Sequence, residues 1–312
     1  MTGIVTLTPN PALDISTAVE RVMPTHKMRC VAPRHDPGGG GINVARVIRR
    51  LGGEVTAIYP RGGLTGQLFD RLVDGENIAR RTSDIAGETR QDFAVHEDAS
   101  GLQFRFVLPG PVLTEHEWRA CLDTLATCTG HADFVVASGS LPPGAPLDFY
   151  GRASRIVTSG GGKFLVDTSG PPLKAALVDG VWLAKPSLRE LCDVVGESLE
   201  DEADWVRACA GLVKDRRTEI VALTLGHRGA LLVARDCALR AEPPPIMPIS
   251  SVGAGDSFLG AMVWGLAAGY DLAAALRLGV AAGSSAVLNP GTELAHADDA
   301  RRLVEAVTVQ EL

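Results

Sequence analysis

This 312-residue sequence lacks the residue spacings that mark metal centres, disulfide frameworks and membrane spans. Its six cysteines are scattered without a CxxC pair, which favours free thiols in a reduced compartment. Its seven histidines form no HExxH or similar spacing, which argues against a zinc site. No uncharged apolar run approaches the roughly 18 residues of a membrane span, and the N-terminus has no signal-peptide pattern. We therefore expect a cytoplasmic protein that works away from membranes.

An excess of positive charge is also missing. The formal net charge is −7, which argues against nucleic acid as a partner because phosphate backbones select basic surfaces. A site for an anionic small molecule must then be a local cluster of arginine and lysine. Apolar residues at 46% and charged residues at 21% are ordinary for a globular chain. The length suits one large domain, or a domain with a small appendage.

Short apolar runs rich in valine, isoleucine and leucine alternate with longer helical patterns. Strands are predicted at 4–8, 55–59, 134–137, 164–167, 181–184 and 220–225. Predicted helices include 43–51, one that begins at Thr114 with a capping-box glutamate at 117, and three near the C-terminus at 256–268, 272–288 and 297–307. This alternation predicts an α/β fold with a doubly wound, mostly parallel sheet flanked by helices.

Two stretches do not fit that rhythm. Segments 14–30 and 89–107 both have the pattern of extended chain, and the second contains a hairpin signal, Asp98-Ala99-Ser100-Gly101. Because the two segments are similar in character, we expect them to pair into a small sheet outside the main one.

The strongest chemical motif is SVGAGDS at 251–257, directly before a predicted helix. Its two glycines let successive backbone N–H groups turn inward at a helix N-terminus, where the helix dipole favours anions. Asp256 then lies on the first turn, facing whatever the loop binds. The plainer interpretation of this pattern is an N-cap aspartate after a flexible loop.

A second glycine-rich run, DPGGGGIN at 36–43, opens the predicted helix at 43–51. Four glycines permit close approach of the backbone to a ligand, and Asn43 offers both a donor and an acceptor to hydroxyl groups. A dinucleotide fingerprint would need a GxGxxG run directly after the first strand and an acidic residue about 20 residues on, and the run does not match it. A GxxxxGK[ST] phosphate loop is also missing from the sequence.

Two further runs follow predicted strands. In KPSLRE, at 185–190, Ser187 and Glu190 form a capping-box pair, and Glu190 could also help to hold Mg²⁺ through water. The run TLGHRG, at 224–229, is a strand-end turn that suits the rim of a nucleotide site, although by itself it is an ordinary turn.

Together these runs resemble the ribokinase-like (PfkB-type) carbohydrate kinases, and among them most closely the minor bacterial 6-phosphofructokinases. The shared runs span the chain: PGGGGINVAR, TRQDFAVHEDASG, QFRFVLPG, SGSLPPG, LGHRGALL and SVGAGDSF. The resemblance implies a single ribokinase-like domain over 1–312. It also implies a β-sheet lid from 14–30 and 89–107, ATP with Mg²⁺, possible binding of K⁺, and a homodimer joined through the lid.

The resemblance also assigns residues. On the substrate side it implies sugar contacts from Asp14, Gly39, Gly40 and Asn43, phosphate contacts from Arg90, Arg105 and Ser140, and a lid lysine at Lys27. On the nucleotide side it implies Lys185, Ser187, Thr224, Gly226, Gly229 and Ser284. For chemistry it implies an anion hole at Gly253, Ala254 and Gly255, Asp256 as the base, Glu190 for Mg²⁺, and Ser250, Val252, Ala286, Asn289 and Gly291 for K⁺.

The implied reaction is ATP-dependent phosphorylation of fructose 6-phosphate at its 1-hydroxyl. Kinases for fructose 1-phosphate or tagatose 6-phosphate usually carry GGKGxN in the sugar loop, whereas this chain has GGGGIN. A non-catalytic sugar- or nucleotide-binding regulator would be marked by a degenerate GAGD run, which is intact here. Two positions depart from the family pattern: Ser187 replaces the asparagine of NxxE and loses an amide donor, and Glu293 stands where a relative carries arginine.

Overall fold

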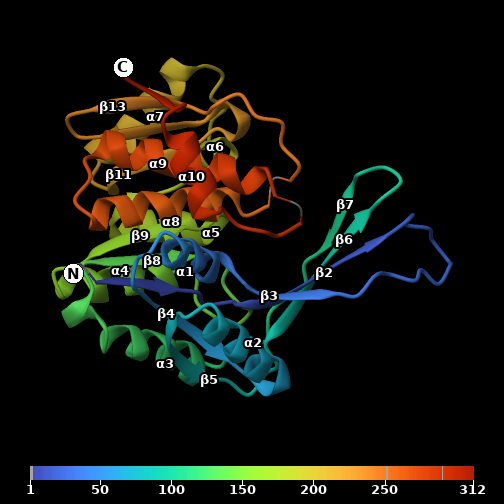
Figure 1. Ribbon diagram of the computed structural model, residues 1–312. Helices are drawn as coiled ribbons and strands as arrows, with labels where there is room; N and C mark the ends of the chain where they lie inside the picture. The colour runs from blue at the N-terminus through green and yellow to red at the C-terminus, as the bar shows by residue number, and fades with distance from the viewer. Residues whose placement is uncertain (1–2, 251, 290) are drawn as a thin grey trace.

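The main sheet organises the chain (Figure 1). The computed structural model describes residues 3–250, 252–289 and 291–312, and in these residues the sheet has ten strands in the order β14-β13-β12-β11-β10-β9-β8-β1-β4-β5. Their bounds are β1 Ile4–Leu7, β4 Val55–Arg61, β5 Ala79–Asp84, β8 Phe134–Ser138, β9 Lys163–Asp167, β10 Val181–Ala184, β11 Thr218–Thr224, β12 Ala230–Ala234, β13 Ala238–Glu242 and β14 Thr308–Glu311.

Strand direction follows the sequence pattern. From β5 to β11 all neighbouring strands are parallel, and β12, β13 and β14 continue the sheet as antiparallel strands. The inner parallel strands, such as β1 and β8, are buried because helices cover both faces, which explains their continuous apolar runs, whereas the edge strand β5 is polar and largely exposed. The predicted doubly wound, mostly parallel α/β sheet is therefore confirmed.

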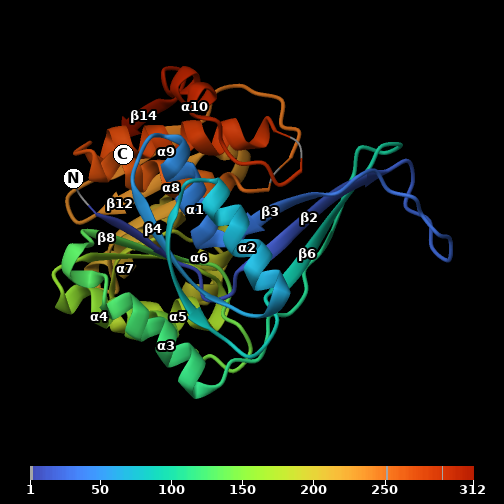
Figure 2. The same ribbon diagram turned by 60° about the horizontal axis from the view of Figure 1, so that its bottom comes forward.

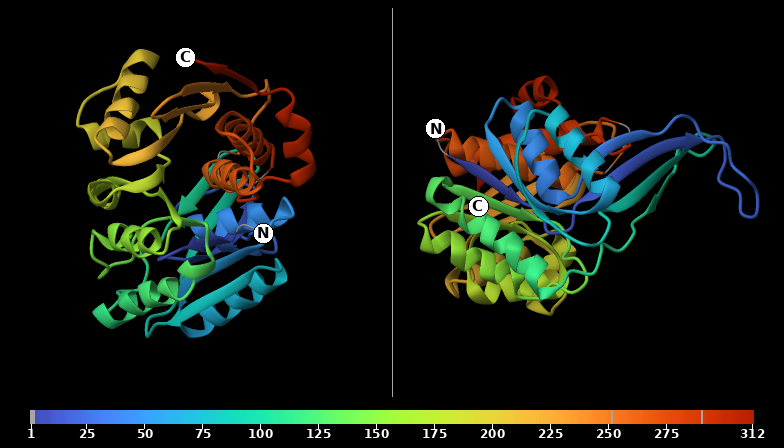
Figure 3. Two further views of the ribbon diagram at one scale, coloured as in Figure 1. Left: turned by 90° about the vertical axis from the view of Figure 1, so that its left-hand side faces the viewer. Right: turned by 90° about the horizontal axis from the view of Figure 1, so that it is seen from below.

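Helices form one layer on each face of the sheet, as the left-hand view of Figure 3 shows. Apolar residues of the first layer pack into one core cluster with the sheet, and those of the second pack into two. The first layer is α1 Gly40–Arg50, α2 Gly63–Gly75, α8 Ala254–Ala267, α9 Leu272–Val287 and α10 Ala297–Val304. The second is α3 Glu115–Ala126, α4 Phe149–Ser159, α5 Gly170–Asp179, α6 Leu188–Val195 and α7 Glu202–Lys214. None of the helices described is both long and apolar enough to cross a membrane.

A second sheet projects from one side of the main one (Figure 2). This small sheet has the order β3-β2-β6-β7, with β2 Ala12–Val19, β3 Arg34–Gly38, β6 Arg90–Glu97 and β7 Gln103–Phe106. The predicted hairpin is present, because β6 and β7 pair antiparallel across the turn at 98–101. The expectation for 14–30 differs in part: β2 ends at Val19, residues 20–33 form an irregular loop, and β3 is a strand that the sequence pattern did not indicate.

Pairing register divides the small sheet into two faces. Asp14 lies opposite Asp36 on one side and Asp92 on the other, and Arg105 lies opposite Ala94. Because side chains alternate along a strand, these residues share one face. The opposite face carries a row made of Ile15, Phe93 and Phe106.

Candidate active site

Helices α1 and α8 bring the two glycine-rich runs together. They cross closely at Gly260, where an added Cβ would come within 3.0 Å of the Val44 carbonyl oxygen and of Val47. Gly40, at the start of α1, fits more tightly still, since a Cβ there would come within 2.1 Å of Ser138 Oγ. The N-termini of both helices thus meet at the carboxyl edge of the parallel strands, where α/β sheets bind ligands.

Asp256 lies in the first turn of α8 and accepts a hydrogen bond of 2.8 Å from Asn43 Nδ2, in the first turn of α1. Gly253 caps the helix at φ 74°, in the left-handed region that favours glycine. Burial raises the pKa of Asp256 to about 6, and the negative charge of Asp167 adds to the rise. The hydrogen bond from Asn43 and the charge of Lys185 oppose it. The carboxylate remains ionised at neutral pH but is more basic than an ordinary aspartate.

A buried ion pair lies beside this carboxylate. Lys185 follows β10 and its Nζ is 3.0 Å from Oδ1 of Asp167, the last residue of the neighbouring strand β9. Burial lowers the pKa of Lys185, but Asp167 and Asp256 more than offset it, and the pKa is raised. The predicted nucleotide-side residue Lys185 is therefore held within the same group of charges as Asp256. Asp167 was not singled out from the sequence.

The run at 185–190 has the predicted local structure. Ser187 Oγ accepts from the Glu190 N–H at 3.3 Å, and a Glu190 carboxylate oxygen accepts from the Ser187 N–H at 2.8 Å, so the capping box of α6 is confirmed. Thr224, at the end of β11, bridges to Ser187 and donates its N–H to the Pro186 carbonyl at 2.9 Å. Ser187 thus caps the helix at the position where the NxxE pattern has asparagine.

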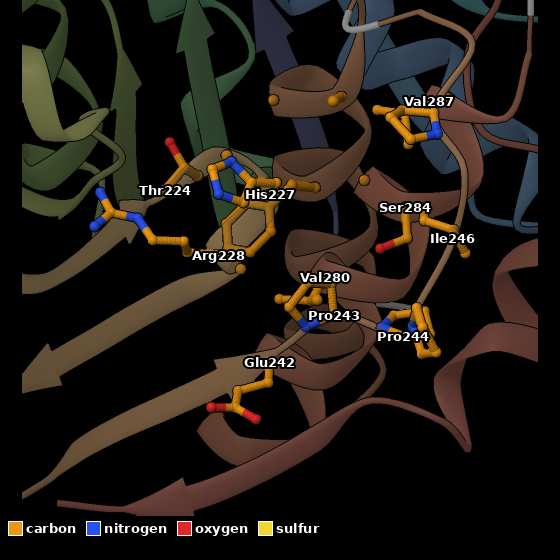
Figure 4. A pocket seen from close by; sticks show the side chains of 18 of the residues that line it. Thr224, His227, Arg228, Glu242, Pro243, Pro244, Ile246, Val280, Ser284 and Val287 are labelled. Atoms are coloured by element: carbon orange, nitrogen blue, oxygen red, sulfur yellow. The ribbon is translucent and has the colours of Figure 1, made fainter.

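A cavity of about 690 Å³ opens next to these residues (Figure 4). Gly255 is one of the residues that line it, and Thr224 and Ser284 face it from opposite sides. Its far wall is apolar, built by Pro243, Pro244, Pro245, Ile246, Phe258, Val280 and Val287. Gly226 and Gly229, both at positive φ, also line the cavity. The volume suits a small ligand with an apolar end, and the helix N-terminus at Gly255 suits an anionic one.

The polar face of the small sheet carries the predicted sugar contact. The Asp14 carboxylate packs directly on Gly38, where a Cβ would come within 2.2 Å of Oδ2. Burial raises the pKa of Asp14 to about 7, the neighbouring Asp92 adds to the rise, and Arg105 opposes it. Gly39, at φ 106°, continues the tight turn into α1. Arg105 also lowers the pKa of Asp256, which indicates that one guanidinium acts on both carboxylates.

Arg90 is fixed by its surroundings, whereas Arg105 is exposed. The Arg90 guanidinium donates to the Leu108 carbonyl at 3.0 Å and to the Asn10 carbonyl at 3.2 Å, and lies 3.4 Å from Asp92. Asn10 also donates through Nδ2 to Ser140 Oγ at 3.2 Å. Asn10 and Asp92 carry no motif of their own and were not predicted from the sequence.

Lys27 is not brought to this group. It is exposed and belongs to the loop 20–33 at the outer end of the small sheet, well away from the main sheet (Figure 1).

The residues suggested for K⁺ lie before α8 and around the end of α9. Ser250 Oγ donates to the Gly291 carbonyl at 2.9 Å and accepts from the Val252 N–H at 3.2 Å. Asn289 donates through Nδ2 to the Leu294 carbonyl at 3.1 Å, and Ala286 lies one turn before it at the end of α9. Ser251, the first residue of the SVGAGDS run, lies outside the described residues.

The family follows from the whole chain. The family model for pfkB family carbohydrate kinases matches residues 9–299, from just after β1 into α10. The chain belongs to this family. The expected ribokinase-like kinase is therefore confirmed, and the pfkB fold accounts for the pairing of the two glycine-rich runs described above.

Curated relatives refine this assignment. The ATP-dependent 6-phosphofructokinase isozyme 2 of Mycobacterium tuberculosis is 46% identical over 302 residues, which cover 97% of this chain and 89% of the relative. The enzyme of the same name from Escherichia coli is 42% identical over 304 residues, which cover 97% and 98%.

Solved structures of a phosphofructokinase are similar to this chain over almost its whole length. Phosphofructokinase-2 from Escherichia coli in complex with fructose-6-phosphate matches with a TM-score of 0.93 at 40% identity over 98% of this chain and 99% of that one. The same protein in complex with potassium matches with a TM-score of 0.94 at 42% identity over 98% and 99%. Its tetrameric inhibited form matches with a TM-score of 0.93 at 40% identity over 98% and 99%.

Proposed function

We propose that this pfkB kinase transfers the γ-phosphoryl group of ATP to the 1-hydroxyl of fructose 6-phosphate, with Asp256 as general base. The observation that carries the proposal is the Asp256–Asn43 hydrogen bond, which joins the helix beside the cavity to the helix beside the small sheet. An acceptor hydroxyl lying between these two sites would meet a carboxylate of raised pKa. The activity printed for the two relatives supports the same reaction.

The chemistry needs positioning and charge stabilisation more than covalent work by the protein. Asp256 accepts the proton of the attacking hydroxyl, and the N–H groups of Gly253, Ala254 and Gly255 stabilise the negative charge that develops on the transferred group. Lys185 adds a fixed positive charge, since a side-chain carbon at Gly255 would lie 3.5 Å from its Nζ. In this scheme Ser187, Thr224, Gly226, Gly229 and Ser284 contact the nucleotide.

The small sheet acts as a lid that supplies the sugar site. Asp14, Gly39, Gly40 and Asn43 contact the sugar, while Arg90, Arg105 and Ser140 bind its phosphate. Arginine suits this task because its planar guanidinium matches phosphate oxygens in pairs. A lid also excludes water, which limits wasteful hydrolysis of ATP.

Divalent and monovalent cations fit two places near this site. Burial raises the pKa of Asp167 and of Asp256; the charge of Glu190 adds to the rise at Asp167, and the charge of Asp167 adds to the rise at Asp256. Three carboxyl groups thus lie around the ammonium of Lys185, so negative charge is in excess there. Oxygen ligands and excess negative charge suit Mg²⁺, and Asp167 and Glu190 would hold it, directly or through water. When bound, Mg²⁺ would neutralise charge on the phosphates of ATP. For K⁺ we propose Ser250, Val252, Ala286, Asn289 and Gly291, whose hydrogen-bonded loops present carbonyl oxygens.

The enzyme would work as a homodimer joined through the small sheets. The support is the apolar row on the face away from the site, where Phe93 is 38% exposed and Phe106 is 53% exposed. Closed two-fold assembly would cover both copies of this row.

One assay tests the reaction against its alternatives. The purified protein with ATP and Mg²⁺ is offered fructose 6-phosphate, fructose 1-phosphate, tagatose 6-phosphate and unphosphorylated fructose, and ADP release is followed by coupled oxidation of NADH. We expect the highest kcat/KM with fructose 6-phosphate. A higher value with fructose 1-phosphate or tagatose 6-phosphate would select those kinases instead. A lack of turnover with every sugar, together with retained ATP binding, would identify a regulator.

A further inference from the structure

Residues 291–295, which follow α9, contact the small sheet. Thr292 Oγ1 lies 3.2 Å from Ser16 Oγ of β2, and the two hydroxyls share a hydrogen bond. The next residue, Glu293, lies 3.4 Å from an Arg34 guanidinium nitrogen of β3. Thr292 is buried, whereas the ion pair is more open to solvent, with the Glu293 side chain 26% exposed and the Arg34 side chain 47% exposed.

The same segment contacts the catalytic loop. Leu294 packs on Gly253, where an added Cβ would come within 2.6 Å of Leu294 Cδ2. The Ala295 N–H donates to Oγ of Ser257, the residue after Asp256, at 3.2 Å. Glu293 therefore lies between Thr292, which contacts the small sheet, and Leu294, which contacts Gly253 of the proposed anion hole.

Ion pairs fix the lid strand that Glu293 reaches. Arg34 pairs with Asp36 at 2.7 Å, and Asp36 pairs with the buried Arg46 of α1 at 3.3 Å. Arg46 in turn pairs with Glu76, after α2, at 2.7 Å. Strand β3 is therefore attached to the body of the protein on one side by Arg46, and to the 291–295 segment on the other by Glu293.

We propose that Thr292 and Glu293 are positioning residues that couple the small sheet to the loop carrying Gly253 and Asp256. Sugar phosphate bound on the small sheet holds β2 and β3 in place, and these strands hold the 291–295 segment through Thr292 and Glu293. Leu294 of that segment then holds the Gly253 loop in the position that binds ATP. The inference rests on the proposed function. Thermodynamic linkage requires the effect to be mutual: fructose 6-phosphate and ATP each raise the affinity for the other by the same factor.

An isolated surface ion pair would do none of this, because such pairs contribute little to stability. The distinguishing feature here is continuity. A lid contact, an ion pair and an anion-hole contact follow one another at 292, 293 and 294, with no flexible segment between them.

The test measures the coupling factor directly. The Kd of a non-hydrolysable ATP analogue is determined by calorimetry with Mg²⁺, without sugar and with saturating fructose 6-phosphate, and the ratio of the two is the coupling factor. Four variants are compared with the wild type: Thr292→Val, Arg34→Gln, Glu293→Gln and the double variant Arg34→Gln/Glu293→Gln. Asp299→Asn is the matched control, since Asp299 is 31% exposed and pairs with Arg302 within α10.

We expect each single variant to lower the coupling factor about threefold, the size that a partly exposed ion pair or hydrogen bond supports. The double variant should fall no further than the larger of the two single losses, because the Arg34–Glu293 pair is the contact that both changes remove. Each change also removes one further partner, Asp36 for Arg34 and His296 for Glu293. The Kd without sugar and the melting temperature should stay near the wild-type values, as should every parameter of Asp299→Asn. A merely structural role would instead lower the melting temperature and leave the coupling factor intact.

Other outcomes overturn the inference. An unchanged coupling factor in Thr292→Val and Glu293→Gln would do so, and so would additive losses in the double variant. A wild type that phosphorylates fructose 6-phosphate without any coupling would overturn the inference and leave the proposed function standing. A wild type that neither binds nor phosphorylates this sugar would overturn both.

Discussion

Asp256 combines the basicity and the position that a proton acceptor needs. Replacing it with asparagine keeps the size of the side chain and the helix start but removes the acceptor. We expect Asp256→Asn to lower kcat by about 10²–10⁴-fold, the range of general-base loss, and to leave the affinity for ATP almost unchanged. Steady-state kinetics with fructose 6-phosphate check the first point and calorimetry with an ATP analogue the second. Turnover close to the wild-type rate would rule out this residue as the base.

Asp14 has a titration of its own that can be separated from that of the substrate. Its pKa of about 7 means that the carboxylate is lost as pH falls through 7, since protonation removes the charge. We expect kcat/KM for fructose 6-phosphate to decline below pH 7 more steeply in the wild type than in Asp14→Asn. The substrate phosphate titrates identically with both proteins, so the ratio of the two profiles isolates Asp14. A ratio that is flat from pH 5 to 8 would show that Asp14 does not govern this limb.

Arg105 is the exposed member of the proposed phosphate pair, and its loss should affect one substrate selectively. We expect Arg105→Ala to raise KM for fructose 6-phosphate and to lower kcat/KM by about 2 kcal/mol, or roughly thirtyfold, as for a lost charged hydrogen bond. Slow phosphorylation of unphosphorylated fructose should be unaffected. Arg207→Ala, which removes another exposed arginine, on α7, is the matched control. Equal losses with both sugars would contradict a phosphate contact.

Residues that belong to short local patterns were predicted well, whereas residues that reach the site only through tertiary pairing were not. The Ser187–Glu190 and Thr114–Glu117 capping boxes are four-residue patterns and were both predicted. Asp167 reaches the site only because β9 lies next to β10, a pairing that no local pattern records. Asn10 and Asp92 were missed for the same reason. Single side chains in a site built from parallel strand ends carry little signal in their own neighbourhoods.

Among elements, β3 shows what a sequence pattern cannot predict. Its residues, Arg-His-Asp-Pro-Gly, include none of the β-branched or aromatic types that favour strands, and it forms because β2 offers a free edge. Helix α8, by contrast, was predicted almost to its bounds, because its start is fixed by the GAGD turn. Tertiary pairing decides the first element, and local chemistry decides the second.

The crossing of α1 and α8 depends on Gly260, and a second helical glycine provides the comparison. An added Cβ at Gly211 of α7 meets nothing within 4 Å, whereas at Gly260 it meets α1 at 3.0 Å. We expect Gly211→Ala to stabilise the protein by about 0.5–1 kcal/mol through helix propensity. Gly260→Ala should destabilise it by about 1–3 kcal/mol and lower kcat, because α1 moves away and the Asn43–Asp256 bond lengthens. Urea unfolding and kinetics measure both effects, and equal stabilisation by the two changes would show that the crossing has room to spare.

At the scale of the whole molecule, the two faces of the small sheet pose opposite requirements. The face with Asp14 and Arg105 must meet the body of the same chain, and the face with Phe93 and Phe106 is left over the solvent. The net charge of −7 disfavours close approach of two copies, so an assembly needs a local apolar patch. The apolar row of the small sheet is such a patch, and the polar face opposite it binds the sugar in our proposal. Assembly and substrate binding would then share one sheet.

This arrangement makes the oligomeric state a test of the small sheet. We expect the wild type to sediment as a dimer at micromolar concentration, and Phe106→Asp to sediment as a monomer because a charge cannot be buried unpaired in an apolar interface. Val178→Asp is the control, since Val178 is 77% exposed at the end of α5, a helix of the main body, and its replacement should leave the dimer intact. The monomeric variant should also bind fructose 6-phosphate more weakly, because an uncovered sheet holds Asp14 and Arg105 less rigidly. A wild type that sediments as a monomer with full activity would contradict the dimer, and a monomeric Phe106→Asp with normal KM would separate assembly from the sugar site.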